Sequence, residues 1–172
     1  MDIGLFVLHV AVGLAFAAHG AQKLFGLFGG HGIEGTAGFF EQIGLRPGKL
    51  HAWASGFAEF GGGVLIALGL FVPFAAAALI AVMVAAVLTV HLRNGFFATE
   101  NGYEYNLELV AAAFALAAIG AGEWSLDAAL GLDLAGTAWA LGALGAGLLG
   151  GVGAVLSGRM LAASGSDQPS TA

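Results

Sequence analysis

The chain has 172 residues, of which 59% are hydrophobic and 9% are charged, and its mean hydropathy is +0.91. Because a soluble domain carries about 25% charged residues, this composition excludes a water-covered surface and predicts the lipid bilayer as the surrounding solvent. The absence of cysteine excludes disulfides and cysteine-ligated clusters, and a net charge of −6 without a basic cluster does not favour nucleic acid as a partner.

The chain contains five apolar segments that are long enough for membrane spans, which need about 20 residues as helices. These segments cover residues 3–22, 50–71, 74–93, 104–121 and 137–157. No basic region precedes the first segment, so we interpret it as a retained span and not as a signal peptide. The short connections around the third segment favour antiparallel packing of neighbouring helices.

The predicted fold class is an all-α integral membrane helical bundle, with a four-helix antiparallel core and a fifth transmembrane helix. We assign the core to residues 1–121, an extracytoplasmic connection and the fifth helix to 122–163, and a disordered cytoplasmic tail to 164–172. The connection 24–48 is rich in glycine and phenylalanine. We expect it to lie at the membrane interface, either with a short amphipathic helix over 35–44 or as a re-entrant segment.

The basic residues predict the orientation of the chain in the membrane. With five spans, all five basic residues fall on the side that holds the C-terminus: Lys23, Arg46, Lys49, Arg93 and Arg159. The positive-inside rule makes this side cytoplasmic. We therefore expect a multi-pass protein of the cytoplasmic membrane, with its N-terminus outside and its C-terminus in the cytoplasm.

Four of the ionisable residues inside the predicted spans are candidates for a shared site. Glu59 lies about nine residues into its span, roughly 14 Å deep, whereas His19, His91 and Glu108 lie roughly 5–6 Å from the cytoplasmic ends. An ionisable group in the membrane is costly, so it should face the bundle interior and have a partner. We therefore predict a cluster of these four side chains and treat them as candidate catalytic residues.

Further residues are candidates for substrate binding beside this cluster. Tyr105 and Asn106 are expected at its rim, and Trp53 is expected to form an apolar wall. Lys23 and Arg93 supply positive charge at the cytoplasmic mouth, and Lys23 is expected to extend towards the interface.

The predicted cluster is compatible with several roles. It could exchange protons with a membrane quinone, bind a metal ion, or form a path for protons or solutes. It could also be a purely structural group that fixes the helix register through hydrogen bonds. No recognised ligand spacing such as HExxH is present, so we assign no metal site. His9 stands alone near the outer end of its span and is expected to be a hydrogen-bonded residue of a helix interface.

Several motifs in combination resemble the DoxX family of small bacterial membrane proteins. These are HGAQKLFGLFGG at 19–30, GFFEQIG at 38–44, AEFGGGVLIALGL at 58–70, HLRNGFF at 91–97 and NGYEYNLEL at 101–109. The resemblance covers about residues 3–121 and leaves the fifth span outside.

The resemblance implies a membrane subunit of a quinone-linked redox system, similar to the membrane subunit of thiosulfate:quinone oxidoreductases. It implies a membrane quinone as cofactor and a redox partner protein on the cytoplasmic side, because this chain has no cysteine to form a redox centre. The alternatives are a non-catalytic scaffold that recruits partner proteins, or a small transporter or proton path.

Overall fold

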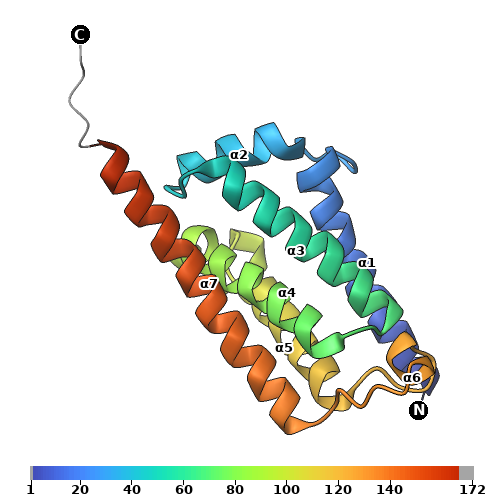
Figure 1. Cartoon of the computed structure of the whole chain (residues 1–172). Helices are drawn as coiled ribbons and strands as arrows, with labels where there is room; N and C mark the ends of the chain where they lie inside the picture. Colours follow the sequence, from blue (N-terminus) through green and yellow to red (C-terminus); the bar gives the residue numbers. More distant parts are fainter. Residues whose placement is uncertain (1, 167–172) are drawn as a thin grey trace.

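Long helices of alternating direction make up the fold, which a computed structural model describes for residues 2–166 (Figure 1). They are α1 Asp2–Phe25, α2 Gly32–Gln42, α3 Gly48–Leu68, α4 Val72–Ala86, α5 Glu104–Ile119, α6 Leu126–Ala129 and α7 Thr137–Ser166. The π-helix η1 (Val87–His91) continues α4, and the short 3-10 helices η2 (Leu92–Asn94) and η3 (Ala98–Glu100) follow it. The predicted all-α fold class is confirmed.

Helices occupy all five positions at which we expected spans. Three are long and apolar enough to cross a membrane: Ile3–Phe25, Val72–Asn94 and Thr137–Ser164. Helix α5 has only 16 residues, which is short of the roughly 20 that a span needs. Helix α3 has 21 residues but carries Lys49, His51 and Glu59. Length and composition therefore support three of the five predicted spans.

Glycines bring the helices into close contact at two seams. Helix α1 packs most extensively on α3, and α4 packs most extensively on α7. A side-chain carbon at Gly63 of α3 would collide with the backbone of Ala17. On α7, a side-chain carbon at Gly151 would come within 2.6 Å of the Ala81 carbonyl oxygen. Small residues at these positions let the helix backbones approach, as is typical of helices packed in lipid.

The turn from α3 to α4 is held by a carboxylate from a distant part of the chain. Gly69 ends α3 in the left-handed conformation, with φ at 59°. The buried Asp127 accepts hydrogen bonds from the backbone N–H groups of Phe71 (2.9 Å) and Val72 (3.4 Å). Its negative charge lies where the unpaired N–H groups of α4 begin, so the segment between α5 and α7 stabilises the start of α4.

His9 connects three helices at the same end of the bundle. Its side chain is 2% exposed. Nδ1 lies 2.9 Å from the carbonyl oxygen of Ile66 on α3, and Nε2 lies 3.3 Å from that of Gly120, which ends α5. The expectation that His9 is a hydrogen-bonded residue of a helix interface is confirmed.

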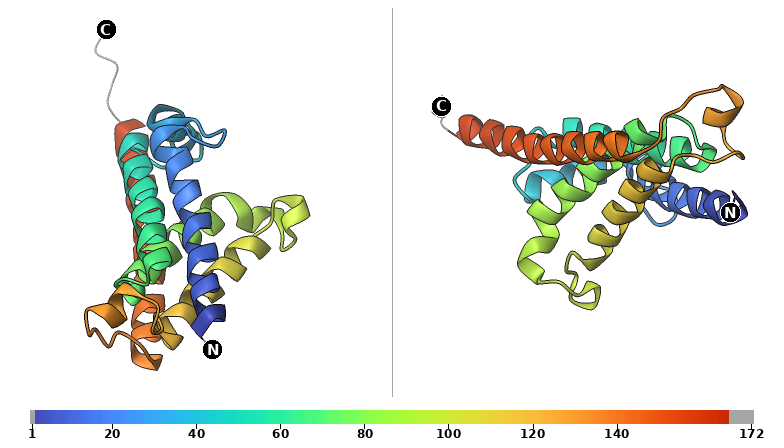
Figure 2. Two further views of the ribbon diagram at one scale, coloured as in Figure 1. Left: turned by 90° about the vertical axis from the view of Figure 1, so that its right-hand side faces the viewer. Right: turned by 90° about the horizontal axis from the view of Figure 1, so that it is seen from below.

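The opposite end of the bundle is covered by α2, which forms where we expected an amphipathic helix. In Figure 2, the outer ends of α4 and α5 (lime and yellow) lean away from α1, α3 and α7. Accordingly, α5 contacts α1 much less than it contacts α4. The predicted disordered tail begins too early, because α7 continues to Ser166. The rest of that tail lies outside the described residues.

Candidate functional site

A cavity of about 840 Å³ lies between α3 and α4, at the end of the bundle that α2 covers. We call it the central cavity. Its volume is in the range of small-molecule sites, about 300–1,000 Å³. Nine polar residues line it: Gln22, Lys23, His31, Thr36, His51, Ser55, Thr89, His91 and Asn101.

The central cavity has three histidines at one end, beside Phe39 and Phe40 of α2, and small apolar residues along most of the other. The three histidines lie near the end formed by α2, the start of α3 and η1. Farther along the helices its wall is made of small apolar residues, including Ala58 on α3 and Ala78 on α4. Helix α7 closes one side with Gly150 and Ala154. This arrangement suits a ligand that has a polar head and an apolar body.

The π-helix η1 brings His91 to the cavity wall and a hydrogen bond fixes its ring. Nδ1 lies 2.8 Å from the carbonyl oxygen of Asn101. A carbonyl can only accept, so Nδ1 carries the hydrogen and Nε2 of the neutral ring is an acceptor. Asn94 donates to the same carbonyl at 3.1 Å and to that of Val90 at 3.2 Å. Single π-turns occur often at functional sites. Here the turn places His91 in the cavity wall, and its Nε2 has no hydrogen-bond partner between residues 2 and 166.

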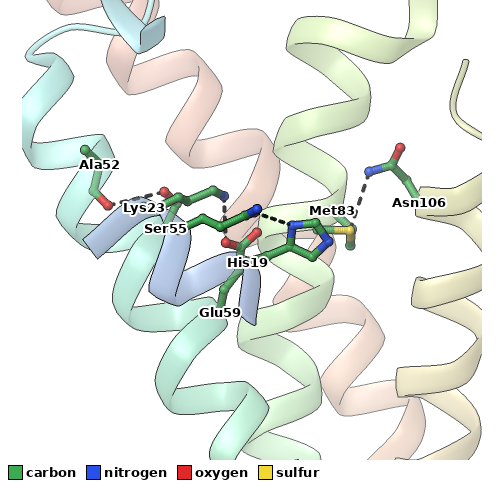
Figure 3. A network of polar contacts seen from close by, with 8 residues as sticks. His19, Lys23, Ala52, Ser55, Glu59, Met83 and Asn106 are labelled. Carbon is green, nitrogen blue, oxygen red and sulfur yellow. Dashed lines mark hydrogen bonds and ion pairs between the residues drawn. The ribbon is translucent and has the colours of Figure 1, made fainter. Parts of the chain in front are cut away.

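Lys23 and Glu59 form a buried ion pair beside the cavity (Figure 3). Lys23 Nζ lies 2.7 Å from Glu59 Oε2, and the two side chains are 25% and 3% exposed. Lys23 lines the central cavity, whereas Glu59 lies behind it. We expected Lys23 to extend towards the interface, and the structure shows it turned inward. The reason is that Glu59 compensates its charge where both groups are withdrawn from water.

The other residues predicted to be catalytic have separate surroundings. His19 is exposed, and its Nδ1 lies 3.1 Å from Gln22 Oε1. Glu108 is exposed on α5. Glu59, His19 and His91 therefore each contact a different partner. Within residues 2–166, no three His, Asp or Glu side chains lie close enough together to hold a metal ion.

The residues predicted to bind substrate are also distributed over the bundle. Trp53 is 44% exposed and stacks on Phe57, with ring centroids 5.2 Å apart. Tyr105 is exposed. Asn106 is buried and its Nδ2 lies 3.5 Å from the sulfur of Met83. Arg93 lines a separate, smaller hollow. Of this predicted group, Lys23 is the one that lines the central cavity.

The sequence reading missed His51 and Ser55, which line the cavity from α3. His51, Ser55 and Ala58 are spaced so that they lie on one face of α3. This pattern in the sequence could have predicted that α3 forms part of the cavity wall. Nε2 of His51 is buried and has no hydrogen-bond partner within residues 2–166. It lies against α7, because a side-chain carbon at Gly158 would come within 2.8 Å of it. No sequence signal indicated that α7 would cover this ring.

Comparison with known proteins gives two findings. A family model described as DoxX matches residues 4–92. The protein named "Putative oxidoreductase CatD" from Bacillus subtilis is 31% identical over 115 residues, which cover 67% of this chain and 79% of that protein. No solved structure matches the chain. The family match spans α1 to the start of η2 and so includes most of the cavity wall. The chain belongs to the DoxX family.

Proposed function

We propose that this chain is the membrane component of a quinone-linked redox system, and that the central cavity holds the quinone headgroup. The observation that carries this proposal is the cavity itself, with imidazoles at one end and small apolar residues at the other. A quinone has the same division between a polar ring and an apolar chain. The oxidoreductase named among the relatives supports a redox role for the family fold.

The cavity residues have the chemistry that a quinone site needs. A bound quinone supplies redox capacity, since its reduction takes two electrons and two protons. His91 Nε2 can exchange a proton with a ring oxygen, because Nδ1 is held by the Asn101 carbonyl. Lys23 can donate a hydrogen bond to the other oxygen while Glu59 balances its charge. The buried Nε2 of His51 is a further polar group, and it has no hydrogen-bond partner among the residues that the structure describes.

Electrons must come from outside this chain. It has no cysteine, so a partner protein or a non-covalent group has to supply the redox centre. We place this partner on the cytoplasmic side. The basic residues lie towards the end of the bundle that α2 covers, and the positive-inside rule assigns this end to the cytoplasm.

The test is to purify the protein in mild detergent, extract the bound lipids and quantify quinone by ultraviolet absorption and mass spectrometry. We expect the wild type to retain quinone in stoichiometric amount. His91→Asn should lose it, because asparagine can still donate to the Asn101 carbonyl but has no group in the place of Nε2. The matched control is His19→Asn, since His19 is exposed and does not line the cavity.

Two results would overturn the proposal. One is a folded wild type that neither retains quinone nor takes it up when quinone is added. The other is an equal loss of quinone in His91→Asn and His19→Asn, since of these two residues only His91 lines the cavity. If His91→Asn retains as much quinone as wild type, the protein binds quinone but His91 does not contribute to binding.

A further inference from the structure

Two arginines line one hollow on the outside of the bundle, and neither has an acidic partner in the described part of the chain. Arg93 follows the π-helix and Arg159 lies on α7, and both side chains are exposed. They share a hollow of about 300 Å³ with Leu88, Thr89, Val90 and Leu92. This hollow does not include His91, the residue that exchanges protons in the proposed function. A ligand held by the two arginines therefore does not require a quinone in the central cavity.

Arg93 and Arg159 lack an acidic partner within residues 2–166, although acidic residues outnumber basic ones in this chain. The chain has eleven Asp and Glu residues and only five Lys and Arg residues. Lys23 pairs with Glu59, and Lys49 pairs with Glu34 at 2.7 Å. Within residues 2–166, neither Arg93 nor Arg159 forms an ion pair or a side-chain hydrogen bond. Two guanidinium groups that share a hollow repel each other unless an anion lies between them.

We propose that Arg93 and Arg159 bind a phosphate group, and that an anionic phospholipid of the membrane supplies it. Planar guanidinium groups bind phosphate oxygens in pairs, so two of them make a specific receptor for this anion. The surroundings favour a lipid as the source. Leu88 and Leu92 are exposed beside the arginines, and Leu156 and Met160 are exposed on the neighbouring turns of α7. Acyl chains can cover these side chains while the phosphate binds the arginines.

The site also joins two parts of the chain. Arg93 belongs to the end of the α4 region, which the family match almost reaches, whereas Arg159 lies on α7, beyond that match. A bound lipid headgroup would therefore connect α7 to the π-helix that carries His91. Clusters of basic residues at a membrane boundary are a known means of binding anionic lipids.

The test uses the full chain in mild detergent with phosphatidylglycerol and phosphatidylcholine as probes. Native mass spectrometry measures how much of each lipid the protein retains. We expect wild type to prefer phosphatidylglycerol, and Arg93→Gln and Arg159→Gln each to lower that preference by about fivefold. Arg46→Gln is the matched control, because Arg46 also lacks an acidic partner within residues 2–166 but does not line the hollow. Arg159→Lys, which keeps the charge but loses the paired donors, should give an intermediate loss.

A second arm separates the lipid from free phosphate. The melting temperature is measured in detergent with inorganic phosphate and with chloride at equal ionic strength. If phosphate raises it in wild type but not in Arg159→Lys or Arg159→Gln, and no lipid preference exists, the arginines bind a free oxoanion and the lipid assignment is overturned. If neither lipid preference nor phosphate stabilisation differs between wild type, Arg46→Gln and the hollow variants, the site itself is overturned. If Arg93→Gln and Arg159→Gln do not fold, the lipid preference and the phosphate stabilisation of Arg159→Lys are compared with those of wild type, and this comparison decides between the outcomes.

Discussion

Lys23 and Glu59 should each depend on the other for its charge to be tolerated in the fold. In Glu59→Gln the Lys23 ammonium loses its 2.7 Å partner in a site that is only a quarter exposed. We expect the free energy of unfolding in detergent to fall by about 3 kcal/mol, since breaking a buried pair on one side leaves an uncompensated charge. Chemical denaturation followed by circular dichroism measures this change.

The double variant Lys23→Met, Glu59→Gln is the control for that experiment. It removes both charges, and most of the lost stability should return, because a buried pair can often be replaced by neutral groups at little cost. If the single and double variants unfold alike, the two side chains do not interact as the geometry indicates. If Glu59→Gln leaves stability unchanged but abolishes quinone retention, Glu59 acts on the ligand and not only on Lys23.

His9 should matter for stability and not for ligand binding. It lies at the end of the bundle opposite the central cavity and contacts the carbonyl oxygens of Ile66 and Gly120. A neutral imidazole carries one N–H and can donate to only one of these carbonyls. His9→Phe therefore removes one buried hydrogen bond and leaves that carbonyl without its donor, which should cost about 2 kcal/mol of unfolding free energy. Quinone retention by the folded variant should match wild type. His19→Phe, at an exposed position outside the cavity, should stay within about 0.5 kcal/mol.

At the scale of elements, the contact between α4 and α7 can be tested by substituting Gly151 and Gly153, two glycines of α7. Gly151→Val should force α7 away from Ala81 and Val84 and cost about 2 kcal/mol, as overpacking does. Gly153→Val, on the other side of the same helix, meets nothing within 4 Å and should leave the free energy of unfolding nearly unchanged. Because α7 forms one side of the cavity, Gly151→Val should also lower quinone retention. Equal stability of the two variants would refute close packing at this seam.

The positions of the helices were accessible from sequence, whereas their contacts were not. Apolar length predicted the helices now seen as α1, α3, α4, α5 and α7. It did not show that Val87–His91 is a π-helix, because an extra residue in a turn leaves no mark on hydropathy. It also did not show the lean of α4 and α5 in Figure 2, which depends on how side chains pack.

The geometry of the candidate site was predictable only in part, for a physical reason. Equal depth in the membrane suggested that His19, His91 and Glu108 meet, but depth does not specify the direction in which a side chain points around its helix. His91 lines the cavity, whereas His19 and Glu108 are exposed. The cost of a charge in the membrane did predict that Glu59 is buried and paired. His51 was missed because its covering residue lies more than 100 positions away, on α7.

For the whole molecule, the proposed orientation can be tested with introduced cysteines, since the chain has none of its own. Asp133→Cys lies in the connection before α7 and Ser164→Cys lies near the end of α7, and both positions are exposed. In intact spheroplasts a membrane-impermeant maleimide should label Asp133→Cys, and it should label Ser164→Cys only after permeabilisation. The reverse pattern would place the central cavity in the outer half of the membrane and its redox partner outside the cell.

The charge balance of Lys23 and Glu59 has an electrical consequence. As an ammonium and a carboxylate 2.7 Å apart they carry no net charge, so the membrane voltage exerts almost no net force on them. A proton gained or lost at this pair would leave one elementary charge inside the membrane, where crossing the full field is worth about 2.3 kcal/mol per 100 mV. If protons for the redox reaction pass only through His91, turnover in proteoliposomes that are supplied with an electron donor for the quinone should depend little on an imposed voltage. A steep dependence would show that the pair itself takes part in proton transfer.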